Sequence, residues 1–167
     1  MEYILDKVKR KDKRVLFQLL QYLLFEVSAN DNISMNKQGL FEYPWFNSYF
    51  TDKEREAYFI KETETKELLG FAMVNKYTQK FENGHSIAEF LILPKYRRQK
   101  IGQKVALDIF KMHEGNWEIH PSNNNNRAFT FWNTVIKEYT DNNYKFEDGL
   151  FLFSNNWYCF LYGKKIW

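Results

Sequence analysis

Residues 87–106 combine an apolar segment, a short basic loop and the start of an amphipathic helix. A loop of this kind leaves the first N–H groups of the helix without partners, and these groups carry partial positive charge. Full positive charges are added by Arg97, Arg98, Lys100 and Lys104. Cations at a helix start oppose the helix dipole and lower stability unless an anion compensates them. Four such cations therefore favour a site for a bound anion over a helix start that is surrounded only by water. The pattern predicts a site for a phosphate or pyrophosphate.

Glu89 is the only charged residue between Ile87 and Leu93. A carboxylate in an apolar run is rarely buried without a partner or a purpose, and desolvation would raise its pKa toward the range of a general base. A structural glutamate paired with a lysine or arginine is the alternative. His120 is a second candidate base, although a histidine at the end of a strand is more often a surface or hydrogen-bonded residue.

The composition indicates one globular domain spanning residues 1–167. Aromatic residues make up 19% of the chain, which excludes a disordered protein, and the net charge of +3 is too small to indicate a nucleic-acid or membrane partner. Cys159 is the single cysteine, so no internal disulfide can form, and the histidines lack metal-ligand spacing. No apolar run suits a signal peptide or a membrane span of roughly 20 residues. We therefore expect a soluble cytoplasmic protein and no metal.

Hydrophobic periodicity predicts the elements that position these residues. Apolar residues recur every three or four positions over 15–27, 101–112 and 129–139, which indicates helices, and residues 38–50 suggest an irregular, partly helical segment. Strands are expected at 3–8, 57–60, 68–74, 86–93, 117–120, 144–153 and 157–163. Strands that alternate with helices in the second half predict an α/β domain with a mixed sheet covered on both faces.

Two short motifs carry a family resemblance. Residues 94–102 read P-K-Y-R-R-Q-K-I-G, and residues 125–132 read N-N-R-A-F-T-F-W. Neither a Walker A pattern nor a G-x-G-x-x-G pattern occurs in the chain. The first motif resembles the acetyl-CoA-binding motif Q/R-x-x-G-x-G/A of the GNAT superfamily of N-acetyltransferases, with Arg97 at its first position and Gly102 at its last. The second is similar to the family's N-x-x-A-x-x-F-Y, and the order of elements over nearly the whole chain also fits.

The resemblance implies a mixed, mainly antiparallel central sheet of about seven strands flanked by about four helices. It also implies an acyltransferase that moves an acetyl group from acetyl-CoA, its cosubstrate, to a primary amine by direct attack in a ternary complex. The acceptor would be a small molecule or a peptide end, held between about residues 28–50 and 144–160. Polyamines, antibiotics, amino acids and protein N-termini remain open as acceptors. The resemblance also allows a homodimer.

The family's site residues map onto this chain by position. The amides that hold the pyrophosphate would be those of Arg98, Gln99, Lys100, Ile101, Gly102, Gln103 and Lys104. The pantetheine arm would pair with the backbone of Leu91, Ile92 and Leu93, where the neighbouring strand splays away. An N–H near Ile92 would polarise the thioester carbonyl, and Asn125 would contact the cofactor from the other side. Several family members use a glutamate in this strand as a base acting through water, which adds to the case for Glu89.

Two residues depart from the family motifs. Lys100 replaces the middle glycine, and if that position needs a positive φ, the lysine costs about 1–2 kcal/mol. The loop would then take another conformation, or Lys100 would reach a phosphate itself. Trp132 replaces the tyrosine that often protonates the leaving thiolate, and an indole N–H is no practical proton donor. A nearby tyrosine, water or direct thiolate release must serve instead.

These departures keep a second function open, a catalytically silent acyl-CoA-binding regulatory module. A basic nucleic-acid-binding domain is a third possibility, and the small net charge argues against it.

Overall fold

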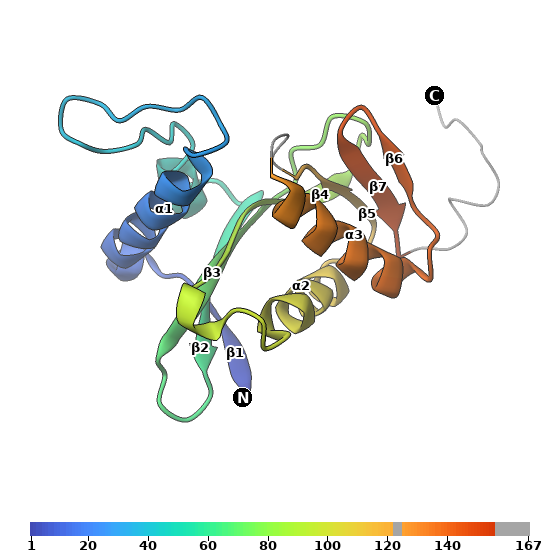
Figure 1. Cartoon of the computed structure of the whole chain (residues 1–167), viewed down its shortest axis with the longest axis horizontal. Helices are drawn as coiled ribbons and strands as arrows, with labels where there is room; N and C mark the ends of the chain where they lie inside the picture. The colour runs from blue at the N-terminus through green and yellow to red at the C-terminus, as the bar shows by residue number, and fades with distance from the viewer. Residues whose placement is uncertain (122–124, 156–167) are drawn as a thin grey trace.

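The strands form one mixed seven-stranded sheet in the order β1-β2-β3-β4-β5-β7-β6 (Figure 1). The computed structural model describes residues 1–121 and 125–155. The strands are β1 (Tyr3–Lys7), β2 (Arg55–Glu62), β3 (Leu68–Asn75), β4 (Gly84–Ile92), β5 (Asn116–Ile119), β6 (Lys145–Glu147) and β7 (Leu150–Ser154). The α-helices of the described part are α1 (Lys13–Val27), α2 (Ile101–Met112) and α3 (Asn126–Thr140). The β4–β5 pair is parallel and the other described pairs are antiparallel, so the predicted sheet is confirmed.

Two predictions about individual elements are wrong. About four helices were expected, but the described residues form three α-helices, because the chain after Pro44 makes only the 3-10 turn Asn47–Phe50. Residues 144–153 were expected as one strand and instead form the β6–β7 hairpin. Asp148 and Gly149 have φ values of 51° and 80°, the positive values that a two-residue hairpin turn requires. The strand predicted at 157–163 lies outside the described residues.

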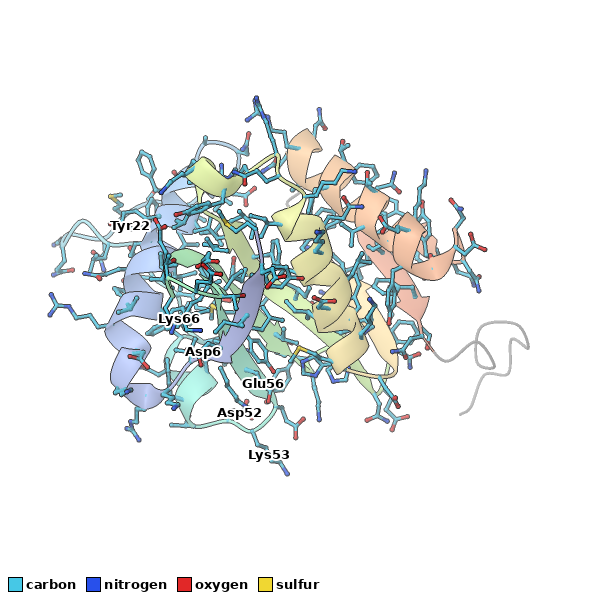
Figure 2. All side chains as sticks on the ribbon, turned by 90° about the horizontal axis from the view of Figure 1, so that it is seen from below. Asp6, Tyr22, Asp52, Lys53, Glu56 and Lys66 are labelled. Atoms are coloured by element: carbon cyan, nitrogen blue, oxygen red, sulfur yellow. The ribbon has the colours of Figure 1, made fainter. Side chains whose placement is uncertain are left out.

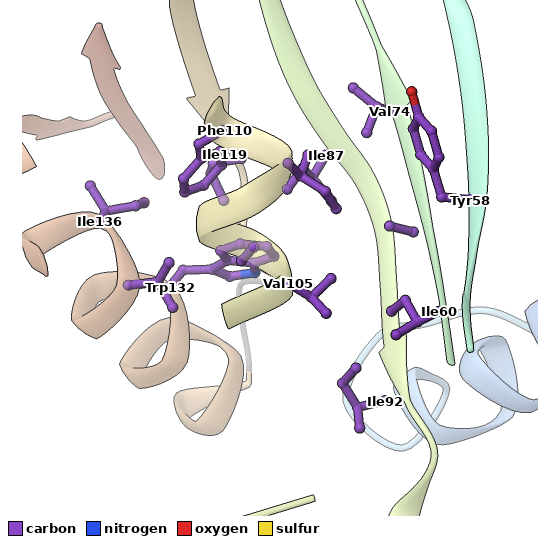
Figure 3. Packing of buried hydrophobic residues seen from close by; sticks show 14 of the residues in the cluster. Tyr58, Ile60, Val74, Ile87, Ile92, Val105, Phe110, Ile119, Trp132 and Ile136 are labelled. Carbon is purple, nitrogen blue, oxygen red and sulfur yellow. The ribbon is translucent and has the colours of Figure 1, made fainter. Parts of the chain in front are cut away.

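Two apolar clusters cover the two faces of the sheet. On one face, Leu16 and Leu20 of α1 pack against a cluster that includes Phe71 and Met73 of β3. On the other face, α2 and α3 cover the sheet with residues such as Val105, Phe110 and Ile136 (Figure 3). Figure 1 shows α1 on one side of the central strands and α2 with α3 on the other. The sheet is therefore the middle layer, and the end of β4 lies between the two helical layers.

The outer surface carries mostly polar side chains, such as Asp6 on β1 and Lys53 before β2 (Figure 2). Tyr22 is an exception on α1, with 62% of its surface exposed. None of the described helices has the length and apolar character needed to cross a membrane.

Glu118 of β5 is a buried carboxylate with a structural role. It is 2% exposed, and its oxygens accept hydrogen bonds from the N–H groups of Gln79, Lys80 and Phe81 at 2.5–2.8 Å. Three donors compensate the buried negative charge, so Glu118 fixes the loop that leads from β3 to β4.

We expect Glu118→Ala to lower the free energy of unfolding by about 3 kcal/mol, because it leaves three buried amides without an acceptor. Urea denaturation at pH 7 measures the change. Glu118→Gln keeps one carbonyl oxygen in place and should lose less. Equal stability of Glu118→Ala and the unsubstituted protein would show that these amides find other acceptors.

Candidate active site

The edge of β4 that faces β5 is open along its second half. β4 and β5 pair through Gly84, His85 and Ser86 on one strand and Asn116, Trp117 and Glu118 on the other. β4 continues to Ile92 and β5 to Ile119, with no further pair between the two described strands. The splay that the family resemblance implies is present. An unpaired strand edge offers backbone N–H and C=O groups to an extended ligand.

Backbone groups at the end of β4 differ in their availability. The N–H of Leu93 donates to the carbonyl of Leu69 on β3 at 2.8 Å, and Arg97 Nε donates to the carbonyl of Ile92 at 2.7 Å. Successive residues of a strand direct their backbone groups to opposite edges. The N–H of Ile92 is therefore directed to the open edge, whereas Leu91 and Leu93 direct theirs to β3.

A tight loop joins β4 to α2. The 3-10 turn Pro94–Tyr96 leads to Arg98 and Lys100, which have φ values of 63° and 59°. Lys100 therefore takes the left-handed conformation that glycine prefers, and it stands immediately before the first residue of α2. The side-chain amide of Gln99 donates to the carbonyl of Lys95 at 3.3 Å. The loop keeps a positive φ at Lys100 despite the missing glycine.

The first turn of α2 presents free backbone donors beside β4. Among the described residues, no acceptor meets the N–H groups of Ile101, Gly102 or Gln103. A Cβ added to Gly102 would lie 3.2 Å from Cγ1 of Ile92, so the helix start is packed against the end of β4. The side chain of Gln103 donates to the carboxylate of Glu138 on α3. The free amides and the N–H of Ile92 thus lie on neighbouring elements.

Three of the four predicted cations form no ion pair with any residue that the structure describes. The Arg97 guanidinium donates to both carboxylate oxygens of Glu26 on α1 at 2.8 Å, so its charge is balanced within the chain. Arg98, Lys100 and Lys104 are exposed and form no ion pair within the described residues. Unbalanced cations beside free helix N–H groups make this loop favourable for an anion.

The second motif forms the start and first turns of α3. Asn125 caps this helix, and its Oδ1 accepts from the N–H groups of Arg127 and Ala128 at 3.1 Å. Its side-chain oxygen is therefore used by the helix, and its NH₂ group has no acceptor among residues 1–121 and 125–155. Trp132 is 7% exposed and packs edge-to-face on Phe90 with ring centroids 5.4 Å apart. This tryptophan is a core residue.

Glu89 lies on β4 opposite Met73 of β3, on the sheet face that α1 covers. Burial raises the pKa of Glu89 to about 7, the Tyr43 hydroxyl opposes this rise, and the negative charge of Asp31 adds to it. A carboxylate with this pKa can accept a proton near neutral pH. Tyr43 carries no signal in the sequence beyond the general density of aromatic residues in 38–50.

His120 immediately follows β5 and is exposed. It forms no hydrogen bond or ion pair with any residue of the described part. No group of three or more His, Cys, Asp or Glu within residues 1–121 and 125–155 could hold a metal ion. Within the part of the chain that the structure describes, Glu89 has polar and charged neighbours that His120 lacks.

Comparison with known proteins finds a family that matches the sequence and solved structures that share the fold. The sequence profile of the Acetyltransferase (GNAT) family matches residues 19–133. No curated protein matches the chain at the sequence level. An aminoglycoside acetyltransferase, AAC(6')-Ib, solved with coenzyme A, has a TM-score of 0.63 at 10% identity, over 92% of this chain and 95% of that one.

Two further solved structures share the fold. A GNAT-family acetyltransferase from Staphylococcus aureus has a TM-score of 0.57 at 11% identity, over 92% of this chain and 99% of that one. The spermidine N-acetyltransferase from Vibrio cholerae, solved with CoA and spermine, has a TM-score of 0.55 at 13% identity, over 80% of this chain and 79% of that one. The family profile covers more than half of the sequence. The chain belongs to the GNAT family of acetyltransferases.

Proposed function

We propose that this protein transfers an acetyl group from acetyl-CoA to a primary amine by direct attack within a ternary complex. The observation that carries the proposal is the open edge of β4 beside the unpartnered amides of α2 and three unbalanced cations. Free amides and cations suit a diphosphate, and an open strand edge suits the amide-containing arm of CoA.

The loop and α2 residues would hold the diphosphate through the amides of 98–104, with Lys100 and Lys104 adding charge. Arg97 would hold the loop in place and would not bind the diphosphate directly, because its guanidinium binds Glu26 and the carbonyl of Ile92. The N–H of Ile92 would meet the arm or the thioester oxygen at the open edge. The NH₂ group of Asn125 would contact the cosubstrate from α3.

Glu89 would supply the base. It would accept a proton from the ammonium form of the acceptor, through water, and the free amine would then attack the thioester carbon. A C–N bond forms, the C–S bond breaks, and the sulfur leaves as a thiolate, while the nitrogen loses its second proton to water as it becomes the amide. The N–H of Ile92 would stabilise the oxyanion that develops in between. Trp132, packed in the core, would take no proton-transfer role, and His120 is the second candidate for the base.

The acceptor is proposed as an amine on the strength of related structures. The spermidine N-acetyltransferase was solved with spermine, and another relative of the same fold, AAC(6')-Iy, with a CoA-acetylneamine bisubstrate analogue. Aromatic residues of 41–50 lie near Glu89 and would form part of the acceptor wall. A homodimer stays an expectation.

A thermal-shift titration with acetyl-CoA and with CoA, followed by thiol release against an amine panel, tests the proposal. Ligand at 100 times its Kd should stabilise the folded state by about 2.7 kcal/mol, which raises Tm by about 5–10 °C in a domain of this size. Stabilisation without thiol release from any amine would favour the silent acyl-CoA-binding module. No stabilisation by either compound would reject the site.

Lys100 gives a prediction with opposite signs for stability and binding. Lys100→Gly should raise the free energy of unfolding by about 0.5–1 kcal/mol, because relief of left-handed strain exceeds the backbone entropy of glycine. The same change should weaken CoA binding about three- to tenfold through the lost cation. Denaturation and calorimetric titration measure the two effects.

Lys100→Ala is the matched control, since it loses the charge but keeps the strain. It should match Lys100→Gly in CoA affinity without the gain in stability. Unchanged affinity in both variants would remove Lys100 from the anion site.

A further inference from the structure

Glu26 lies in the last turn of α1, where a negative charge is unfavourable. The carbonyl groups at a helix C-terminus carry partial negative charge, so a carboxylate there lowers helix stability unless a cation compensates it. The last turn of α1 contains no basic residue. The compensating cation is Arg97, 71 residues away in the sequence, whose Nη2 donates to both carboxylate oxygens of Glu26 at 2.8 Å. Glu26 is therefore placed for a contact outside its own helix.

Arg97 joins Glu26 to the end of β4. While Nη2 binds Glu26, Nε donates to the carbonyl of Ile92 at 2.7 Å. A strand residue directs its N–H and C=O groups to the same edge, so the carbonyl of Ile92 lies at the open edge of β4 together with its N–H. Arg97 occupies this carbonyl and leaves the N–H of Ile92 for a ligand. Charge-assisted bonds at two of its nitrogen atoms fix the orientation of the guanidinium.

The loop that follows Arg97 contains two unfavourable backbone conformations. Arg98 and Lys100 have φ values of 63° and 59°, which place both in the left-handed region that only glycine adopts readily. Such conformations persist where the surrounding structure fixes them. On the α2 side, Gly102 packs against Ile92. On the β4 side, the bonds of Arg97 hold the start of the loop.

We propose that Glu26 is a positioning residue for the cosubstrate. Through Arg97 it holds the loop in the conformation that directs the free amides of α2 toward the diphosphate, and it leaves the N–H of Ile92 as the group that meets the ligand. Glu26 itself touches neither CoA nor the amine. This inference rests on the proposed function, in which CoA binds along this loop.

The sign of the effect separates positioning from the opposite role. If Glu26 instead held Arg97 away from the diphosphate, removal of Glu26 would free a cation and strengthen CoA binding. Simple electrostatics gives the same sign, because loss of a carboxylate near an anion site lowers repulsion. Only positioning predicts weaker binding. The bond from Arg97 to the carbonyl of Ile92 favours positioning, since it fixes the guanidinium to the chain independently of Glu26.

Glu26→Gln tests the inference because it keeps the size of the side chain and removes its charge. The Kd for CoA, measured by calorimetric titration, should rise about three- to tenfold. The kcat at saturating acetyl-CoA should change less than the Kd, since Glu26 does not touch the reacting groups. In an Arg97→Ala background, Glu26→Gln should leave the Kd unchanged, because Glu26 acts through Arg97 alone. A merely structural role would not give this dependence on Arg97.

Glu67→Gln is the matched control. Glu67 pairs with Lys95 at 3.1 Å, close to the same loop, and the Lys95 side chain has no hydrogen bond to β4 within residues 1–121 and 125–155. The substitution removes the same charge without releasing Arg97. It should leave the Kd for CoA unchanged or lower it slightly. Thermal unfolding of each variant shows that it is folded before titration.

An unchanged or lower Kd in folded Glu26→Gln protein overturns the inference, and a lower Kd would show that Glu26 withholds Arg97 from the diphosphate. An equal rise in Glu67→Gln, or an equal rise in the Arg97→Ala background, would overturn it as well, because the effect would then not depend on Arg97. If CoA fails to bind the unsubstituted protein, the proposed function is rejected and the inference with it, so the two failures are distinguishable.

Discussion

Glu89→Gln should lower kcat about 100- to 1,000-fold, with the Kd for acetyl-CoA unchanged within about twofold. Glutamine keeps the size of the side chain and one carbonyl oxygen but cannot accept the proton of the ammonium group. The cosubstrate contacts proposed at the α2 start and at Ile92 do not include this side chain. Thiol-release kinetics and calorimetric titration separate the two effects. Unchanged turnover would make Glu89 a structural charge.

The pH profile strengthens this test. Because the pKa of Glu89 is raised to about 7, kcat/KM of the unsubstituted protein should rise with pH through about 7, as the carboxylate forms. A carboxyl whose pKa is higher in the folded state stabilises the fold when protonated, and this stabilisation is lost as pH rises toward 7. Glu89→Gln removes that loss, so its Tm at pH 8 should equal or exceed that of the unsubstituted protein. A loss of activity could then not be assigned to unfolding.

The regular elements could be predicted because their signals are local. The apolar spacing of Leu16, Leu20 and Leu24 predicted α1, and the continuous apolar runs predicted β2 and β3. The error at 144–153 has a local cause too, since the Asp148-Gly149 turn signal lies within an aromatic stretch that by itself predicts one continuous strand. The described residues thus bear out the sheet and correct its last hairpin.

The candidate site likewise has a part that the sequence predicts and a part that only the fold determines. The basic loop before α2 could be predicted, because Arg98, Lys100 and the start of α2 lie within a few residues of one another. The carboxylate that balances the charge of Arg97 is distant in sequence, on Glu26, 71 residues away. Charged and aromatic residues are frequent in this chain, so only the fold determines which of many possible partners meet. The cosubstrate contacts themselves stay predictions.

Gly70 is a position that the sequence analysis did not single out, and it controls how β3 and β4 meet. A Cβ built on Gly70 would lie 1.9 Å from the carbonyl oxygen of Leu91. Both groups belong to backbone in the centre of the sheet, so neither can move away as a flexible side chain would. The register shift in β2 at Ile60 and Lys61 lies beside this close approach. Gly70 thus lets β4 approach β3 closely at Leu91, immediately before β4 and its open edge end at Ile92.

Gly70→Ala should therefore lower the free energy of unfolding by about 3–5 kcal/mol, measured by urea denaturation. Any folded fraction should also bind CoA more weakly, because displacement of Leu91 moves the N–H of Ile92. Gly102→Ala is the matched control: its Cβ would lie 3.2 Å from the side chain of Ile92, which can yield, so its loss should stay within about 1 kcal/mol. If Gly70→Ala and Gly102→Ala had similar stabilities, β3 and β4 could move apart at Gly70 with little loss of stability. The close approach at Gly70 would then not fix the position of Leu91 and Ile92.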